Sequence, residues 1–281
     1  APSSPALCFA WLPRPSPCAR IFQPQSERSA RCLAALGPVM SSSKLQLQYW
    51  PLFAKGIAPA LALEFGGFDW EMGPRPGDKG TDDVWGEWME MKWQTTWGFL
   101  PNLKLPEGKT VGSELAILQY LARKGGSELC GKSDEEWLVS QELLHHAEEL
   151  YQKIVNNVPT TMAPDKSPEN YTAFMTADDK NTHSNAQGLK VYLWQFEEFY
   201  TKNGGKDGKF TSSGVTVGEL KLFATLQILV LIKADVLSGF PILLAFMGAM
   251  SERAPVKAIL DGTAKGMSSG PFPQYFIAPP E

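Results

Sequence analysis

The chain has 281 residues, of which 43% are hydrophobic and 20% charged, and its formal net charge is −4. This is the composition of a globular protein, and without a basic surface we expect neither nucleic acid nor a membrane as a partner. The four cysteines form no CxxC pair and no regular spacing. This argues against a disulfide framework or a zinc site, so we expect no metal, and a reducing compartment.

Residues 1–39 differ in composition from the rest of the chain. They carry repeated proline, four arginines and a single acid, Glu27. Such a segment resembles an organelle transit peptide, but Met40–Lys44 is typical of an ordinary cytosolic start. We therefore expect a disordered extension, either non-native or a targeting peptide, outside the fold. The expected location is cytoplasmic, with organelle targeting as the alternative.

The first folded elements are expected directly after this extension. Residues 44–49 alternate between apolar and polar side chains, which predicts a half-buried strand. The Ala- and Leu-rich residues 56–65 predict a helix, in which Pro59 can occupy the first turn. An aromatic run at residues 68–72 predicts a second strand. Residues 73–96, rich in Gly, Pro and Trp, predict an irregular surface connection.

Two further strands and a helix complete the expected α/β unit. The strands are predicted around Leu103 and at residues 109–111, and the helix begins near Ser113 with apolar residues at helical spacing. The order βαβ followed by ββα is typical of a thioredoxin-like domain. We assign this domain to residues 40–125.

The remainder of the chain predicts helices alone. Capping boxes at Ser133–Glu136 and Thr216–Glu219 each mark a helix start, and residues 188–200 predict another helix. The apolar stretch 222–250 is interrupted by charges and by Pro241, so it predicts buried helix and no membrane span. We assign residues 133–270 to an all-helical bundle domain and residues 271–281 to a C-terminal tail.

Seven segments, in order along residues 44–260, resemble those of the cytosolic glutathione S-transferase superfamily, with a mu- or sigma-like, tyrosine-type pattern. They are Tyr49–Trp50, Gly56–Leu61, Phe99–Leu103 followed by Gly108, Ser113–Arg123, Leu129–Gly131, Val215–Phe223, and Phe240–Pro241 with Pro255–Ala258. The resemblance implies a thioredoxin-like domain that binds glutathione, a helical domain that binds the second substrate, and a homodimer.

The implied activity is conjugation of glutathione to hydrophobic electrophiles, a detoxification reaction in which glutathione is the co-substrate. The nucleophile is the thiolate, and a hydroxyl that donates a hydrogen bond to the sulfur favours its formation. The resemblance assigns this role to Tyr49; the alternative is that Tyr49 only packs at the strand end. The loop at residues 51–55 is two residues longer than in the mu or sigma pattern.

The resemblance also implies the other contacts to glutathione. Trp88 and Lys92 match a pair that binds the glycyl carboxylate. The backbone of Leu100, before a cis Pro101, matches the site of the cysteinyl part. The helix start at Ser113 and Glu114 matches the γ-glutamyl carboxylate site, although the family order of these two residue types is reversed. The implied glutathione-binding set is Tyr49, Trp50, Trp88, Lys92, Phe99, Leu100, Pro101, Ser113 and Glu114.

Other functions on the same fold stay open. One alternative is a non-catalytic glutathione-binding or interaction protein, which the Ser113–Glu114 order favours. Another is a glutathione-dependent isomerase of the prostaglandin D synthase kind. In a homodimer, Trp97 or Phe99 would dock into the partner, and Glu148 or Glu149 would reach across to the ligand's amino group. The electrophile would lie among residues 51–55, 151–155 and 272–277.

Overall fold

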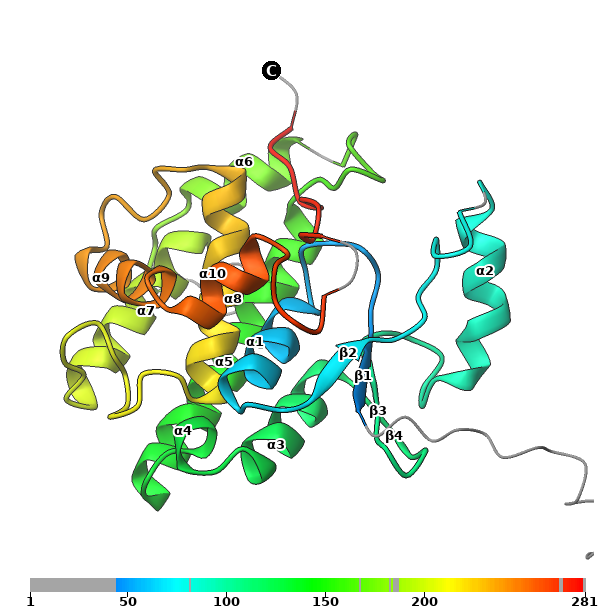
Figure 1. Cartoon of the computed structure of the whole chain (residues 1–281). Coiled ribbons are helices and arrows are strands. Elements are labelled where there is room, and N and C mark those ends of the chain that lie inside the picture. Colours follow the sequence, from blue (N-terminus) through cyan, green and yellow to red (C-terminus); the bar gives the residue numbers. More distant parts are fainter. Residues whose placement is uncertain are drawn as a thin grey trace, which may run out of the picture. The chain divides into compact units, whose positions relative to one another are not determined.

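The computed structural model describes residues 44–80, 82–166, 168–181, 183, 187–267 and 270–279. Our expectations for residues 1–39 lie outside this described part. The described residues belong to one compact unit. Figure 1 shows a small sheet at one side of this unit and a larger set of helices packed beside it.

The sheet has four strands in the order β2-β1-β3-β4. β1 and β2 are parallel, whereas β3 is antiparallel to both β1 and β4. The first and second strands are joined by α1, which makes a βαβ unit, as a parallel pair requires. The strands are β1 (Leu45–Gln48), β2 (Trp70–Met72), β3 (Asn102–Lys104) and β4 (Thr110–Gly112), and α1 spans Ile57–Phe65.

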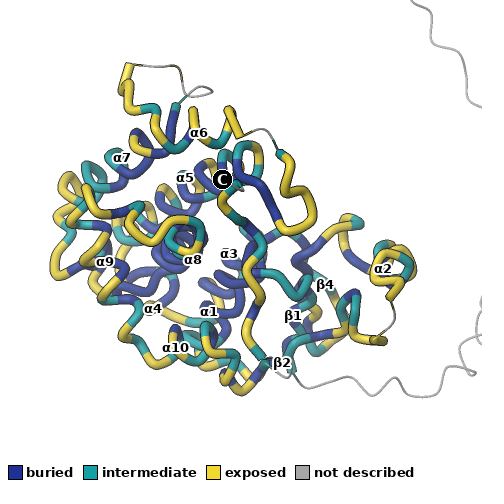
Figure 2. Tube along the Cα trace, turned by 90° about the horizontal axis from the view of Figure 1, so that it is seen from above, coloured by how far each residue is buried: buried dark blue, intermediate teal, exposed yellow. Residues whose placement is uncertain are grey.

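The alternation in the first strand has the predicted effect. Leu45 and Leu47 are buried, while Gln46 and Gln48 are half-buried. Leu47 pairs with Met72 on one side and with Leu103 on the other, so β1 lies in the centre of the sheet. The helix α1 is buried along most of its length and covers the sheet together with α3 (Glu114–Lys124) (Figure 2).

The expected irregular connection at residues 73–96 was wrong in part. It contains the helix α2 (Val84–Met91), followed by the short 3₁₀ helix η1 (Lys92–Gln94). The Asp83 carboxylate accepts a hydrogen bond from Gly86 N–H at 2.8 Å and so caps the helix. Trp88 is the buried aromatic residue of α2, and its ring contacts the ring of Trp50. The N-cap residue was the sequence feature that we overlooked.

Among the described residues after the sheet, every secondary-structure element is a helix, as predicted. The helices α5 and α8 pack most closely, because Gly218 at the start of α8 lies directly against the backbone of Ser140, and a Cβ at this position would be 2.0 Å from the Ser140 carbonyl oxygen. Among the described helices, none is both long and apolar enough to cross a membrane. The remaining helices are α4 (Ser127–Cys130), α5 (Asp134–Asn157), α6 (Pro168–Thr176), α7 (Leu189–Lys202), α8 (Val217–Ile232), α9 (Pro241–Ser251) and α10 (Ala254–Leu260).

The two predicted capping boxes differ in the structure. At α8, Thr216 and Glu219 form the full reciprocal box. At α5, the Ser133 hydroxyl accepts from Glu136 N–H, but the Glu136 carboxylate accepts from the backbone N–H groups of Lys132 and Ser212 instead. Glu136 therefore ties the start of α5 to the segment that precedes α8.

Candidate functional site

Tyr49 follows β1 and is only 5% exposed. Gly56, at the start of α1, allows the helix to approach the ring, because a Cβ at this position would lie 2.4 Å from Tyr49 Cδ1. The backbone N–H of Lys55 donates to the Tyr49 hydroxyl oxygen at 2.9 Å. Since the phenol oxygen accepts this bond, its own proton remains for a different acceptor.

The helix α3 begins beside this tyrosine with an unusual backbone. Ser113 has φ 75°, a region that L-residues rarely occupy. Its side chain makes no capping hydrogen bond to the helix. The next residue, Glu114, is 3% exposed and its carboxylate is directed into the protein.

Four charged side chains form a cluster of alternating sign, which we call the ion cluster: Lys55, Glu114, Glu148 and Lys221. Glu114 and Lys221 are buried, whereas Glu148 and Lys55 are 16% and 25% exposed. Lys221 Nζ lies 2.6 Å from Glu114 Oε2 and 2.8 Å from Glu148 Oε2. Lys55 Nζ lies 2.5 Å from Glu148 Oε1 and 4.0 Å from Glu114 Oε2. Each charge therefore has two neighbours of opposite sign, which is what a charge buried away from water requires.

The ring of Tyr151, on α5, is a further partner of both cations. Lys55 Nζ lies 4.9 Å and Lys221 Nζ 4.5 Å from the ring centroid, within the range of cation–π contacts. The same ring meets Phe276 of the C-terminal tail edge-on, with centroids 6.0 Å apart.

Burial controls the ionisation of the groups around Tyr49. It raises the pKa of Tyr49 and of Tyr151, and the Glu114 charge raises both pKa values further. Burial also raises the pKa of Glu114, against the pull of Lys221 and Lys55. For the less buried Glu148 the same two ammonium groups outweigh burial, and the pKa is lowered. Both phenols are therefore held neutral at physiological pH.

The C-terminal tail lies against the loop before α1 and the segment after α5. Phe53 N–H donates to the Pro273 carbonyl at 2.7 Å, and Thr161 N–H donates to the Tyr275 carbonyl at 2.9 Å. Ile277 N–H donates to the Pro159 carbonyl at 3.0 Å. We expected the tail and the loop at residues 51–55 both to line the electrophile site. In the structure these two segments are hydrogen-bonded to each other.

The structure separates the remaining predicted residues. Trp50 and Trp88 are in ring contact at 5.4 Å, whereas the Lys92 ammonium lies 5.2 Å from the Trp93 ring. The peptide bond between Leu100 and Pro101 is cis, and both residues are buried immediately before β3. Phe99 and Trp97 are 48% and 67% exposed. Glu148 belongs to the ion cluster, whereas Glu149 points outward and lies 3.4 Å from His146 Nδ1.

Two residues of this site were missed in the sequence. Lys55 lies in the loop that we assigned only to the electrophile. Lys221 is a single cation in an otherwise apolar helix stretch, and lysine is rarely buried unless it is paired. That feature could have identified Lys221 as a paired, buried residue, although not its partners.

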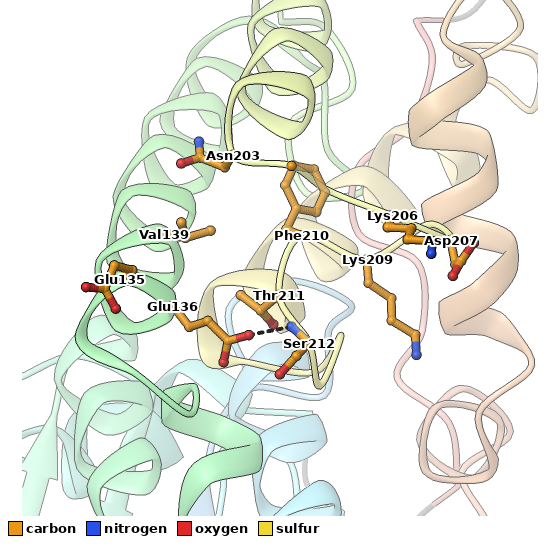
Figure 3. A pocket seen from close by; sticks show the side chains of 11 residues that line it. Glu135, Glu136, Val139, Asn203, Lys206, Asp207, Lys209, Phe210, Thr211 and Ser212 are labelled. Carbon is orange, nitrogen blue, oxygen red and sulfur yellow. Dashed lines mark hydrogen bonds between the residues drawn. The ribbon is translucent and has the colours of Figure 1, made fainter.

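The chain also contains cavities away from this region. One of about 470 Å³ opens between the start of α5 and the loop at residues 203–212 (Figure 3). Its charged lining is mixed, with three acids and two lysines, and it includes none of the predicted site residues. Within the described residues, no group of three or more His, Cys, Asp or Glu side chains could hold a metal ion.

No family model and no curated protein matches the sequence. Several solved structures match the fold, each over 76% of this chain. Prostaglandin synthase D of Nilaparvata lugens is matched over 96% of its length with 16% identity and a TM-score of 0.59. The Pi-class glutathione S-transferase of Onchocerca volvulus is matched over 90% with 20% identity and a TM-score of 0.60.

The glutathione S-transferase of Ascaris lumbricoides is matched over 94% of its length, with 19% identity and a TM-score of 0.56. At these identities the likeness concerns the fold. The mixed four-stranded sheet followed by helices agrees with it, and the predicted fold class is confirmed. The chain has the glutathione S-transferase fold, a thioredoxin-like unit followed by an all-helical one.

Proposed function

We propose that this protein is a glutathione transferase in which the Tyr49 hydroxyl donates a hydrogen bond to the glutathione thiolate. The fold supports this proposal, as does the hydrogen bonding of Tyr49. The Lys55 N–H fixes the phenol oxygen, and burial raises the phenol pKa. A neutral, oriented O–H is the donor that stabilises a neighbouring thiolate.

The other contacts to glutathione follow the same proposal. The Leu100 backbone beside Pro101 would pair with the cysteinyl part, and the start of α3 at Ser113 would receive the γ-glutamyl carboxylate. Trp88 and Lys92 would bind the glycyl carboxylate. Trp50, Phe99 and Glu114 complete the proposed set, Glu114 through its backbone N–H because its carboxylate is turned into the ion cluster. No metal takes part.

The proposed organisation assigns glutathione to residues 40–125 and a hydrophobic electrophile to residues 133–270 with the tail, residues 271–281. We further propose a mu- or sigma-like enzyme that acts in detoxification, as a cytoplasmic homodimer. Trp97 and Phe99 are exposed enough to dock into a partner.

A second candidate is a glutathione-binding protein without transferase activity. It is favoured by the low exposure of Tyr49 and by the hydrogen bond between Phe53 and Pro273, which joins the loop to the tail. In this case the ligand would bind without turnover.

The test is glutathione conjugation to a generic aromatic electrophile, with calorimetric glutathione binding, for the full chain and for Tyr49→Phe. We expect both proteins to bind glutathione and the variant to turn over at least tenfold more slowly, about 1.4 kcal/mol of transition-state stabilisation. Tyr171→Phe is the matched control, because this half-buried tyrosine lies on α6. It should leave turnover unchanged.

Binding without turnover in the wild type would support the second candidate. Absence of glutathione binding would overturn both. Equal turnover by the wild type and Tyr49→Phe would remove Tyr49 from the mechanism.

A further inference from the structure

Lys221 is a fully buried cation in the helix α8, with a side chain 1% exposed. Its helical neighbours from Val217 to Leu226 are buried as well. An ammonium in such a place costs several kcal/mol unless ionic partners compensate it. Lys221 has such partners in the carboxylates of Glu114 and Glu148, and it also contacts the Tyr151 ring. Three side chains, on the two helices α3 and α5, therefore fix its position.

The partner Glu114 is the first residue of α3. A carboxylate in the first turn is stabilised by the N–H groups of its own helix end. Glu114 instead makes a 2.6 Å contact with Lys221, 107 residues further along the chain. Its side chain is 2% exposed, so it is directed away from solvent.

This orientation leaves the start of α3 without a side-chain cap. The Ser113 hydroxyl makes no capping bond. Among the described residues, no hydrogen bond from the N–H of Leu115 or Ala116 is present. Were the Glu114 carboxylate to turn back toward these groups, it would occupy and repel any anion bound there.

We propose that Lys221 is a positioning residue of the glutathione site, which holds the Glu114 carboxylate inside the protein and cancels its charge so that an anionic ligand can bind between α3 and Tyr49. The inference rests on the proposed function and deepens it. Lys221 itself contacts neither the ligand nor the sulfur in this role.

The charge balance gives the proposal a distinctive signature. The ion cluster holds two cations and two anions, so it is neutral as a whole. Removal of the cation leaves a net negative charge beside Tyr49, whereas removal of the Glu114 charge leaves a net positive one. The net negative charge disfavours a thiolate, and the net positive charge favours it. The titratable and charged groups that face this region are Lys55 before α1, Glu114 on α3, Glu148 and Tyr151 on α5, Lys221 on α8 and Tyr275 in the tail.

The experiment compares four full-length proteins: wild type, Lys221→Met, Glu114→Gln and the double variant. Calorimetry measures glutathione affinity, and the ultraviolet absorbance of the thiolate against pH gives the thiol pKa of bound glutathione. We expect Lys221→Met to bind at least tenfold more weakly with a higher thiol pKa. Glu114→Gln should change both quantities in the opposite direction. The double variant should return toward the wild type.

Lys257→Met is the matched control, because Lys257 forms a 2.7 Å ion pair with Glu252 on the surface. It should change neither quantity. Circular dichroism checks the fold of each protein. If Lys221→Met does not fold, Glu114→Gln alone still tests the proposal, because the proposal expects tighter glutathione binding and a purely structural role expects weaker binding.

A purely structural role would make both single variants bind more weakly, and that result would overturn the inference. Unchanged affinity and thiol pKa in Lys221→Met would overturn it as well. If the wild type does not bind glutathione, the proposed function fails first and the inference falls with it. These outcomes are distinguished by the wild-type titration alone.

Discussion

The starts of α3 and α8 each bury a glutamate in the first helical turn. Glu114 and Glu219 are 3% and 0% exposed. Glu219 accepts hydrogen bonds from the N–H and hydroxyl groups of Thr211 and Thr216, and from Phe210 N–H. No cation of the described part of the chain forms an ion pair with it. Glu114 instead depends on the ammonium of Lys221. Two equally buried carboxylates are thus stabilised in different ways: Glu219 by hydrogen-bond donors close in sequence, and Glu114 by a charge far away in sequence. We expect the two sites to respond differently to substitution.

The largest effect is expected when the distant charge is removed. Lys221→Met should lower the free energy of unfolding by about 3–5 kcal/mol, because it leaves the buried Glu114 carboxylate with only the more distant Lys55, 4.0 Å away, as a cation. Glu114→Gln in the same protein should recover most of this loss. Urea denaturation followed by circular dichroism measures both, and a double variant no more stable than Lys221→Met would contradict the pairing.

A smaller effect is expected at the locally stabilised glutamate. Glu219→Gln should lower the free energy of unfolding by about 2–3 kcal/mol, since it weakens hydrogen bonds to a charged acceptor. No partner substitution should recover it, because the donors include backbone N–H groups. Glu198→Gln on α7 is the control, since its ion pair with Lys202 is largely exposed and should contribute little. Recovery of Glu219→Gln by a single cation change would contradict the comparison.

The smallest effect concerns pH. Burial raises the pKa of Glu114 above its ordinary value of 4.5. An acid whose pKa is higher in the folded than in the unfolded state contributes stability below the unfolded pKa, and this contribution is lost as the pH rises through the folded pKa. Glu114→Gln should therefore gain stability relative to the wild type as the pH rises above 4.5. The gain should be about 1.4 kcal/mol for each pH unit that separates the folded from the unfolded pKa.

Urea denaturation of both proteins at several pH values tests this sign. Glu148, whose pKa is lowered, acts in the opposite direction but is present in both proteins. A stability difference that stays constant or shrinks with rising pH would show that burial does not control the ionisation of Glu114.

The comparison also shows which parts were predictable from sequence. The box at Thr216 and Glu219 is a pattern of four neighbouring residues, so it marked the start of α8 correctly. The alternation at residues 44–49 likewise predicted β1. These features depend on neighbours in the chain, and the sequence alone contains them.

The contacts of the ion cluster could not be predicted in the same way. Glu114 was assigned to the ligand because it begins a helix, and no local pattern pairs it with a lysine 107 residues away. The contact of the tail with Phe53 is similarly distant. Such pairs are set by how α3, α5 and α8 pack together, which a single sequence does not specify. The helix α2, in contrast, was missed although its cap at Asp83 was local.

Because the ion cluster is neutral as a whole, it restricts which substitutions this protein can accept during evolution. A single substitution at any of the four positions leaves the cluster, whose members Glu114 and Lys221 are fully buried, with an unbalanced charge, so each first step is unfavourable on its own. A cation and an anion must be lost or gained together. In any lineage that carries this cluster, we expect the four positions to be inherited as compensated pairs, and a sequence that lacks Lys221 to lack one of the two carboxylates as well.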